Sequence, residues 1–306
     1  MTATIAPPEP ETSVETPAPP VDRPDDVAMR LVGQWIGILA VVGLSFLVHI
    51  GLIGAVQHER DQAALHEQLR SELALATAPV GPTDVDGRPL VSGDPVALLE
   101  IPSLGVVEVV GEGTSAGVLM SGPGHRRDTV LPGQAGVSVI AGRRAAYGGP
   151  FASIGLLRGG DQIVVTTGQG RHVYRVLGVR RAGDPLPAAL AAGKGRLTLM
   201  TADGPPFLPT DVVRVDAQLI TPAQQAPARL PSDALPAAEE TLATDSSALV
   251  PLVLWAQLLL AAAVALVWVR HRVGGWQSWV IGLPVLIAIG AQVADQAAAA
   301  LLPNLL

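Results

Sequence analysis

Three long uncharged hydrophobic segments dominate the pattern of this 306-residue chain. Residues 31–56 and 248–269 contain no Asp, Glu, Lys or Arg, and residues 276–302 contain Asp295 alone. About 20 apolar residues are enough to cross a bilayer, so the pattern predicts three transmembrane helices. Because a carboxylate is costly in hydrocarbon, we expect Asp295 either to pair with another group or to lie at the membrane interface.

Short β-type runs fill the stretch between the first two hydrophobic segments, from residue 93 to residue 220. Each run is rich in branched apolar residues, and Gly, Pro and Asp separate the runs. The seven runs are Val96–Ile101, Val106–Val110, Val137–Ile140, Gln162–Thr167, His172–Val179, Arg196–Thr201 and Val212–Leu219. Around seven short strands between turn signals predict a sandwich or a small barrel.

The remaining segments are polar or rich in proline. Residues 1–30 combine prolines and acidic residues, which predicts a disordered tail. Residues 57–92 begin with an amphipathic helical pattern and continue as a linker, and residues 221–247 form a second linker. The short basic loop at 270–272 is expected to be cytoplasmic, which places the N-terminus inside and the β-rich region and the C-terminus outside.

Composition narrows the chemistry that the chain can perform. The formal net charge of −7 gives no reason to expect a nucleic-acid partner. The chain has no cysteine, which excludes disulfides, thiolate metal sites and a cysteine nucleophile. No His-x-x-x-His pattern or carboxylate cluster suggests a metal site, and we expect no cofactor.

A set of motifs follows the β-type runs in a specific order. They are "GPGH" at 122–125, "LPG" at 131–133, "VIAGRRAAYGGPF" at 139–151, "GDQIVV" at 160–165 and "LTLMTADG" at 197–204. With this order and spacing, the chain resembles the sortase family, in its membrane-anchored actinobacterial form, over roughly Val96–Leu219. Sortases are cysteine transpeptidases of Gram-positive cell surfaces. The resemblance implies a mainly β fold, an eight-stranded β-barrel outside a plasma membrane that the chain crosses three times.

The resemblance also implies a mechanism whose three residues are missing here. In the family a cysteine thiolate attacks an LPXTG-like sorting signal, a histidine acts as acid and base, and an arginine stabilises the oxyanion. The histidine position falls on Arg143, the cysteine position on Ala202, and the arginine position on Asp211 or Val212. We therefore expect a degenerate member without the catalytic His, Cys and Arg.

Several residues remain candidates for binding. They are His125, Arg143, Arg144, Tyr147, Thr201 and Arg214. The two adjacent arginines could supply fixed positive charge for a carboxylate or phosphate, or they could be a solvated pair beside an acid. His125 could instead be a structural histidine in a loop, and Arg214 is a weak replacement for the missing arginine.

Three functions are compatible with these observations. The first is an inactive accessory factor that binds a sorting-signal-like peptide, a surface protein or an active sortase. The second is an active transpeptidase or hydrolase with an unconventional nucleophile. The third is a structural membrane protein whose barrel has no binding role.

Overall fold

The computed structural model describes residues 24–84, 86–205, 207–227, 231, 235–273 and 275–306. Contacts divide the chain into two units, Met1–Ser45 and Phe46–Leu306. In the first unit the described residues belong to helix α1 (Pro24–Val48). The helix therefore begins inside the segment that the composition predicts to be disordered, and the other residues of that segment, 1–23, lie outside the described part.

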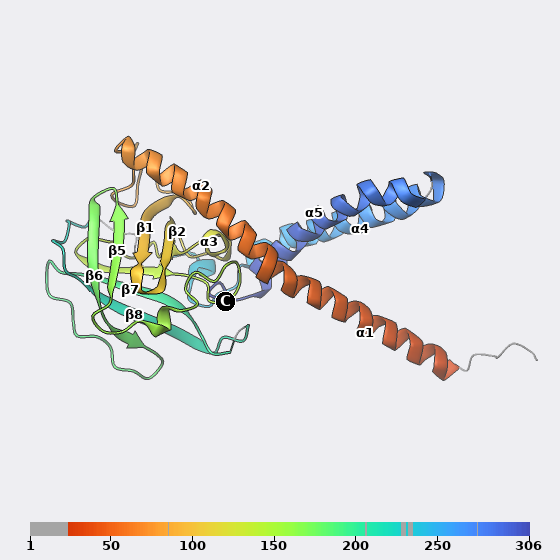
Figure 1. Cartoon of the computed structure of the whole chain (residues 1–306), viewed down its shortest axis with the longest axis horizontal. Coiled ribbons are helices and arrows are strands. Elements are labelled where there is room, and N and C mark those ends of the chain that lie inside the picture. Colours follow the sequence, from red (N-terminus) through yellow and green to blue (C-terminus); the bar gives the residue numbers. More distant parts are fainter. Residues whose placement is uncertain (1–23, 85, 206, 228–230, 232–234, 274) are drawn as a thin grey trace, which may run out of the picture. The chain divides into compact units, whose positions relative to one another are not determined.

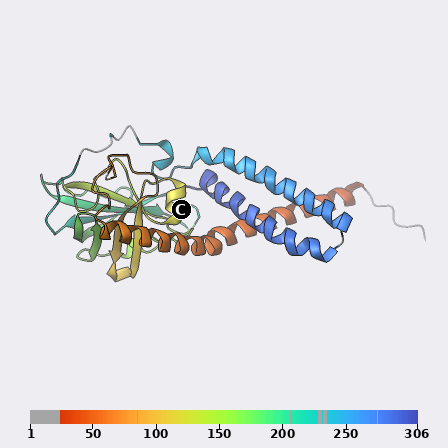
Figure 2. The ribbon, with the colours of Figure 1, turned by 90° about the horizontal axis from the view of Figure 1, so that it is seen from above.

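A π-helical turn, η1 (His49–Ile53), continues the chain into helix α2 (Gly54–Ala74). Helix α2 lies along one side of the barrel (Figures 1 and 2). Its Leu69 is buried, as the amphipathic pattern predicts. The Gln62 amide nitrogen donates to the Val109 and Ser121 carbonyl oxygens at 3.1 and 2.9 Å, and its oxygen accepts from Val109 N–H at 2.7 Å. Because these partners are barrel backbone groups, α2 is fixed to the barrel by specific polar contacts.

Eight strands close into a barrel, which confirms the predicted fold class. Their order around the barrel is β1-β2-β3-β4-β7-β8-β6-β5. The strands are β1 (Pro95–Ile101), β2 (Val106–Glu112), β3 (Gly124–His125), β4 (Gly136–Ala141), β5 (Gln162–Thr167), β6 (Gly170–Arg180), β7 (Gly195–Asp203) and β8 (Asp211–Leu219). Seven correspond to the predicted runs. The eighth, β3, has two residues and no β-type pattern of its own.

Short helical turns connect the strands and the helices. They are η2 (Pro102–Leu104), α3 (Ala116–Ser121), η3 (Ile154–Leu156), η5 (Ala237–Glu239) and η6 (Ser246–Ala248).

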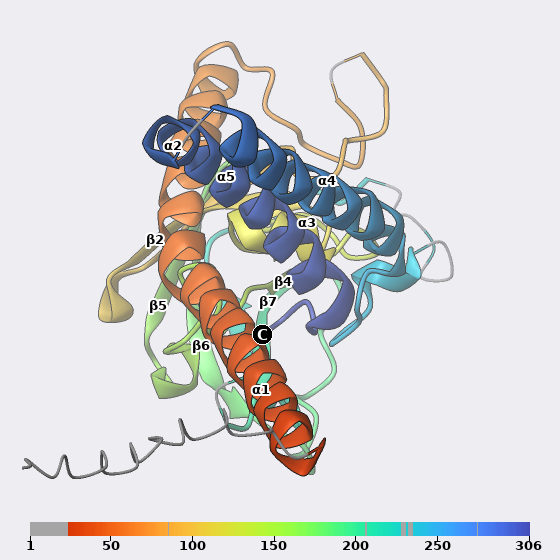
Figure 3. The same ribbon diagram turned by 90° about the vertical axis from the view of Figure 1, so that its right-hand side faces the viewer.

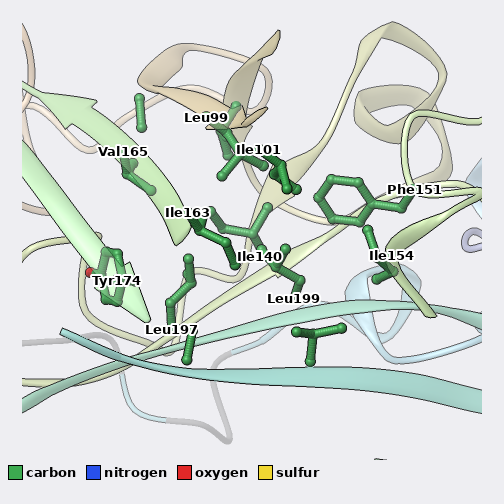
Figure 4. Packing of buried hydrophobic residues seen from close by; sticks show 14 of the residues in the cluster. Leu99, Ile101, Ile140, Phe151, Ile154, Ile163, Val165, Tyr174, Leu197 and Leu199 are labelled. Carbon is green, nitrogen blue, oxygen red and sulfur yellow. The ribbon is translucent and has the colours of Figure 1, made fainter. Parts of the chain in front are cut away.

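The barrel is filled by branched apolar side chains from most of its strands. Leu99, Ile140, Ile163, Leu197 and Leu199 are fully buried and meet inside it (Figure 4). Burying one such side chain stabilises a fold by about 1.5–3 kcal/mol. Strands β4 and β7 are neighbours in the barrel and pair in parallel. Their ends are held in a fixed register as a result, and those ends carry the candidate site.

Two long apolar helices follow the barrel, α4 (Leu249–Val273) and α5 (Gly275–Leu301). They run side by side as a hairpin (Figures 1 and 3). By length and composition, three described helical segments can cross a membrane, namely Leu39–Ala74, Ser246–Arg272 and Val280–Leu301. The prediction of three membrane-spanning helices agrees with this finding.

Candidate functional site

The three positions predicted to replace the catalytic residues of the sortase pattern meet at one end of the barrel. β4 ends at Ala141, which is paired with Met200 of β7. Ala202, near the end of β7, is paired directly with Val212 of β8. Arg143 follows β4 by two residues, so the strand register brings all three positions to one place. We call this place the corner.

Ala202 lies under an apolar cover in the corner. It is 2% exposed and packs in a cluster with Leu119, Met200, Val212 and Leu305. Leu305, which follows α5, is itself 1% exposed. The space beside Ala202 is therefore filled by side chains of the same chain.

Arg143 is buried, which makes the prediction of a solvated arginine pair wrong for this residue. Its exposure is 0%, and its Nη2 donates to the Ala116 carbonyl oxygen at 3.1 Å. The guanidinium carbon lies 5.2 Å from the centre of the Tyr147 ring, within the range of a cation–π contact. Burial lowers the pKa of Arg143 to about 10, so the side chain is still charged at neutral pH. Among the described residues, its Nε and Nη1 have no hydrogen-bond partner.

Arg144 is the next residue in the same loop and remains partly exposed. Its Nη1 donates to the Ala202 carbonyl oxygen at 3.1 Å and lies 3.4 Å from Asp203 Oδ1. Its backbone N–H donates to the Leu305 carbonyl oxygen at 3.1 Å. Arg144 therefore links the end of β7 to the segment that covers Ala202, and the expected acid beside the arginine pair is Asp203.

Tyr147 joins the corner to the membrane-spanning part of the chain. Its hydroxyl donates to Asp295 Oδ1 of α5 at 2.8 Å, and its backbone N–H donates to the Ile50 carbonyl oxygen at 3.0 Å. Burial, together with the neighbouring Asp295 carboxylate, raises the pKa of Tyr147. The residue has a φ of +51°, which is uncommon for a bulky side chain and persists only where surrounding contacts impose it.

Asp295 is held by two further donors besides Tyr147. His49 Nε2 lies 2.7 Å from Oδ1, and Gln57 Nε2 donates to Oδ2 at 3.1 Å. We call Tyr147, Asp295, His49 and Gln57 the polar junction. Of the two readings of Asp295 that the sequence allows, the structure favours a carboxylate paired inside the chain.

His125 lies in the barrel wall, on strand β3. It is 1% exposed, with Nδ1 2.9 Å from Glu112 Oε2 and Nε2 3.0 Å from the Val130 carbonyl oxygen. Burial alone would lower the pKa of His125, but the Glu112 carboxylate outweighs it and the pKa is raised. Both ring nitrogens are occupied, which supports a structural role over ligand binding.

The last two candidates lie on β7 and β8. Thr201 is 2% exposed, and its hydroxyl donates to the Gly142 carbonyl oxygen at 2.8 Å. Arg214 is half-buried and is paired with Met200 and with Arg180 in the strand register. It stands two residues beyond the expected arginine position, as the sequence indicates.

Sequence reasoning missed two members of the site. Leu305 lies just beyond the predicted third span, 276–302, and nothing in the pattern marks it as a cover for Ala202. His49 could have been found, because it is a lone histidine in an uncharged span and Asp295 is a lone acid in another. Within the described part of the chain, no group of three or more His, Cys, Asp or Glu side chains could hold a metal ion.

Comparisons with known proteins, by sequence and by structure, match this chain to sortases. A family model described as "Sortase domain" matches residues 99–219. The chain is 35% identical to Sortase SrtE1 of Streptomyces coelicolor over 131 residues, 38% of this chain and 37% of that protein. It is 31% identical to Sortase D of Bacillus subtilis over 86 residues, 28% of this chain and 42% of that protein. The chain thus spans about two fifths of the length of these curated relatives.

One solved structure, sortase E from Streptomyces avermitilis, is 30% identical to this chain. The alignment covers 49% of this chain and 100% of that one, with a TM-score of 0.37.

Proposed function

The chain belongs to the sortase family through its domain at residues 99–219, and we propose that it is a multi-pass plasma-membrane member without transpeptidase activity that acts by binding. The proposed site of action is the cell surface of a Gram-positive bacterium, with the barrel outside. One observation carries the loss of activity: Ala202 is 2% exposed and packs in one buried cluster with Leu305. A substrate carbonyl would find neither a nucleophile nor space there.

The other catalytic roles are also unfilled. Arg143 cannot serve as a general base, because a guanidinium with a pKa of about 10 keeps its proton at neutral pH. Val212 offers no donor to an oxyanion, and Asp211 would repel one. These absences act together, since the members of a catalytic unit depend on one another.

An unconventional nucleophile has little support. The Thr201 hydroxyl already donates to the Gly142 carbonyl oxygen, and Thr201 and Ser138 are 2% and 1% exposed. A buried hydroxyl without an adjacent base cannot be activated for attack.

The proposed partner is a protein or peptide of the cell surface, such as a sorting-signal-like peptide, a surface protein or an active sortase. Arg143 is not available to it, because that side chain is fully buried. An open concave surface lies instead between α2 and α3, with a volume of about 370 Å³ and lined in part by Ala64, Leu65, Gly111 and Val118. This volume lies in the range of ordinary ligand sites.

The activity arm of the proposal is tested with the purified full chain in detergent. The chain is incubated with an LPXTG-type peptide and an amine acceptor, and products are followed by mass spectrometry beside a cysteine-containing sortase. We expect no cleavage above buffer. Cleavage that disappears in Thr201→Val or Ser138→Ala would overturn the assignment.

The binding arm is tested by cross-linking in membranes. A photoreactive residue at Leu65 should capture a discrete partner, while the same residue at the exposed Leu156, on the barrel, should not. Identical capture at both positions would argue against a specific surface beside α2.

A purely structural role is the second candidate, and the polar junction favours it. Tyr147, Asp295 and His49 join the barrel to the membrane helices through buried contacts. If cross-linking at Leu65 yields no partner while disruption of the junction removes the protein from membranes, the structural role would be preferred.

A further inference from the structure

The loop between β7 and β8 carries exposed apolar side chains. Residues 204–210, "GPPFLPT", contain no charged residue. Leu208 is 71% exposed and Phe207 is 39% exposed, whereas Phe151 is fully buried in the barrel. Single exposed apolar residues are common on protein surfaces, but these two are adjacent in one uncharged loop.

The base of this loop is tied to the segment that follows the last membrane helix. Arg144 pairs with Asp203, the last residue of β7, and its backbone N–H donates to the Leu305 carbonyl oxygen. Tyr147, on the same short loop as Arg144, reaches Asp295, which lies inside the candidate span Val280–Leu301. The corner therefore lies near the Leu301 end of that span. The β7–β8 loop starts from the corner, on the side of the barrel from which α4 and α5 extend (Figure 1).

Charged groups gather at the base of the loop and are absent from its tip. Arg144 and Arg181 both pair with Asp203, at 3.4 and 3.3 Å, and the Arg181 side chain is 54% exposed. Asp211 stands opposite Asp203 in the strand register. An apolar tip with arginines at its base is the arrangement of interfacial segments, in which cations lie at the headgroups. Asp203 and Asp211 balance the charges of the two arginines. We therefore expect that contact of the loop with a bilayer does not require anionic lipids.

We propose that the β7–β8 loop inserts Phe207 and Leu208 into the barrel-side interface of the bilayer that holds α4 and α5. The position of the loop supports this, because it starts from the corner, where Tyr147 contacts Asp295 inside the candidate span. The proposal is independent of whether the protein binds a partner or catalyses a reaction.

The test uses the absence of native cysteine, which makes single-cysteine variants unambiguous. Full-length Leu208→Cys carries a nitroxide label and is reconstituted into phosphatidylcholine nanodiscs. The matched control is Val107→Cys, at a 61% exposed position on β2. Phe207→Cys provides a second probe if Leu208→Cys does not fold.

The readout is collision of the label with apolar oxygen and with a water-soluble nickel chelate. We expect the Leu208 label to collide more with oxygen and several-fold less with nickel than the Val107 label does. Equal nickel accessibility at both positions would overturn the proposal. Protection that appears only when cell-surface proteins are added would also overturn it, because it would assign the loop to a protein partner.

Discussion

Removal of one hydroxyl should loosen the polar junction by a measurable amount. Tyr147→Phe deletes the donor that lies 2.8 Å from Asp295 Oδ1. A hydrogen bond to a charged group contributes about 1.5–3 kcal/mol to stability. Because His49 and Gln57 continue to hold the carboxylate, we expect a loss near the lower end, about 2 kcal/mol. For 150–250 residues, 1 kcal/mol shifts Tm by about 2–4 °C, so Tm should fall by about 4–8 °C.

A double-mutant cycle makes this prediction specific. Tyr147→Phe, Asp295→Leu and the double variant are unfolded thermally in detergent micelles, with tryptophan fluorescence as the readout. Direct contact predicts a coupling energy of about 1–2 kcal/mol. The matched control is Tyr174→Phe, whose hydroxyl accepts from the Gly133 N–H and which should combine additively with Asp295→Leu. Effects of Tyr147→Phe and Asp295→Leu that add within about 0.5 kcal/mol would refute the junction as a stabilising contact.

Three further predictions concern the corner, the barrel wall and helix α2. A thiol in Ala202→Cys should resist maleimide in the folded protein and react once Leu305→Gly removes its neighbour; rapid labelling of the single variant would contradict the buried site. The pKa of His125 is raised in the fold. Its contribution to the free energy of unfolding should therefore be full below about pH 6.5 and lost as pH rises through the folded pKa. Glu112→Gln should abolish that pH dependence of Tm, and an unchanged profile would exclude the pair. Gln62→Ala breaks three hydrogen bonds to barrel backbone groups and should raise hydrogen exchange in α2 selectively; unchanged exchange there would contradict the docking.

The architecture could be predicted because its signals are local. Uncharged runs of 20 or more residues report membrane helices, and branched apolar runs between turns report strands. Strand β3 was not predicted, because Gly124–His125 is too short to carry a periodic pattern. The closed barrel was predicted from the family motifs, because the number of strands alone is also compatible with a sandwich.

The site could be predicted only in part, because its decisive contacts are distant in sequence. The strand register pairs Ala202 with Val212, the two positions that the motifs predict as the cysteine and arginine positions. The burial of Arg143 could not be predicted, because a loop arginine is ordinarily solvated and here Ala116 and Tyr147 surround it. The contact between His49 and Asp295 spans 246 positions, and no local pattern encodes such a pairing.

The contact between Tyr147 and Asp295 has a consequence for the order in which the protein is made. Tyr147 leaves the ribosome 148 residues before Asp295, a delay of roughly 7–30 s at 5–20 residues per second. The last barrel strand, β8, is made within that time, but the corner still lacks Leu305 and Tyr147 still lacks its acceptor. The corner can therefore close only after α5 has been made, so a chain whose last helix fails to insert would expose Ala202 and Arg143 to proteolysis.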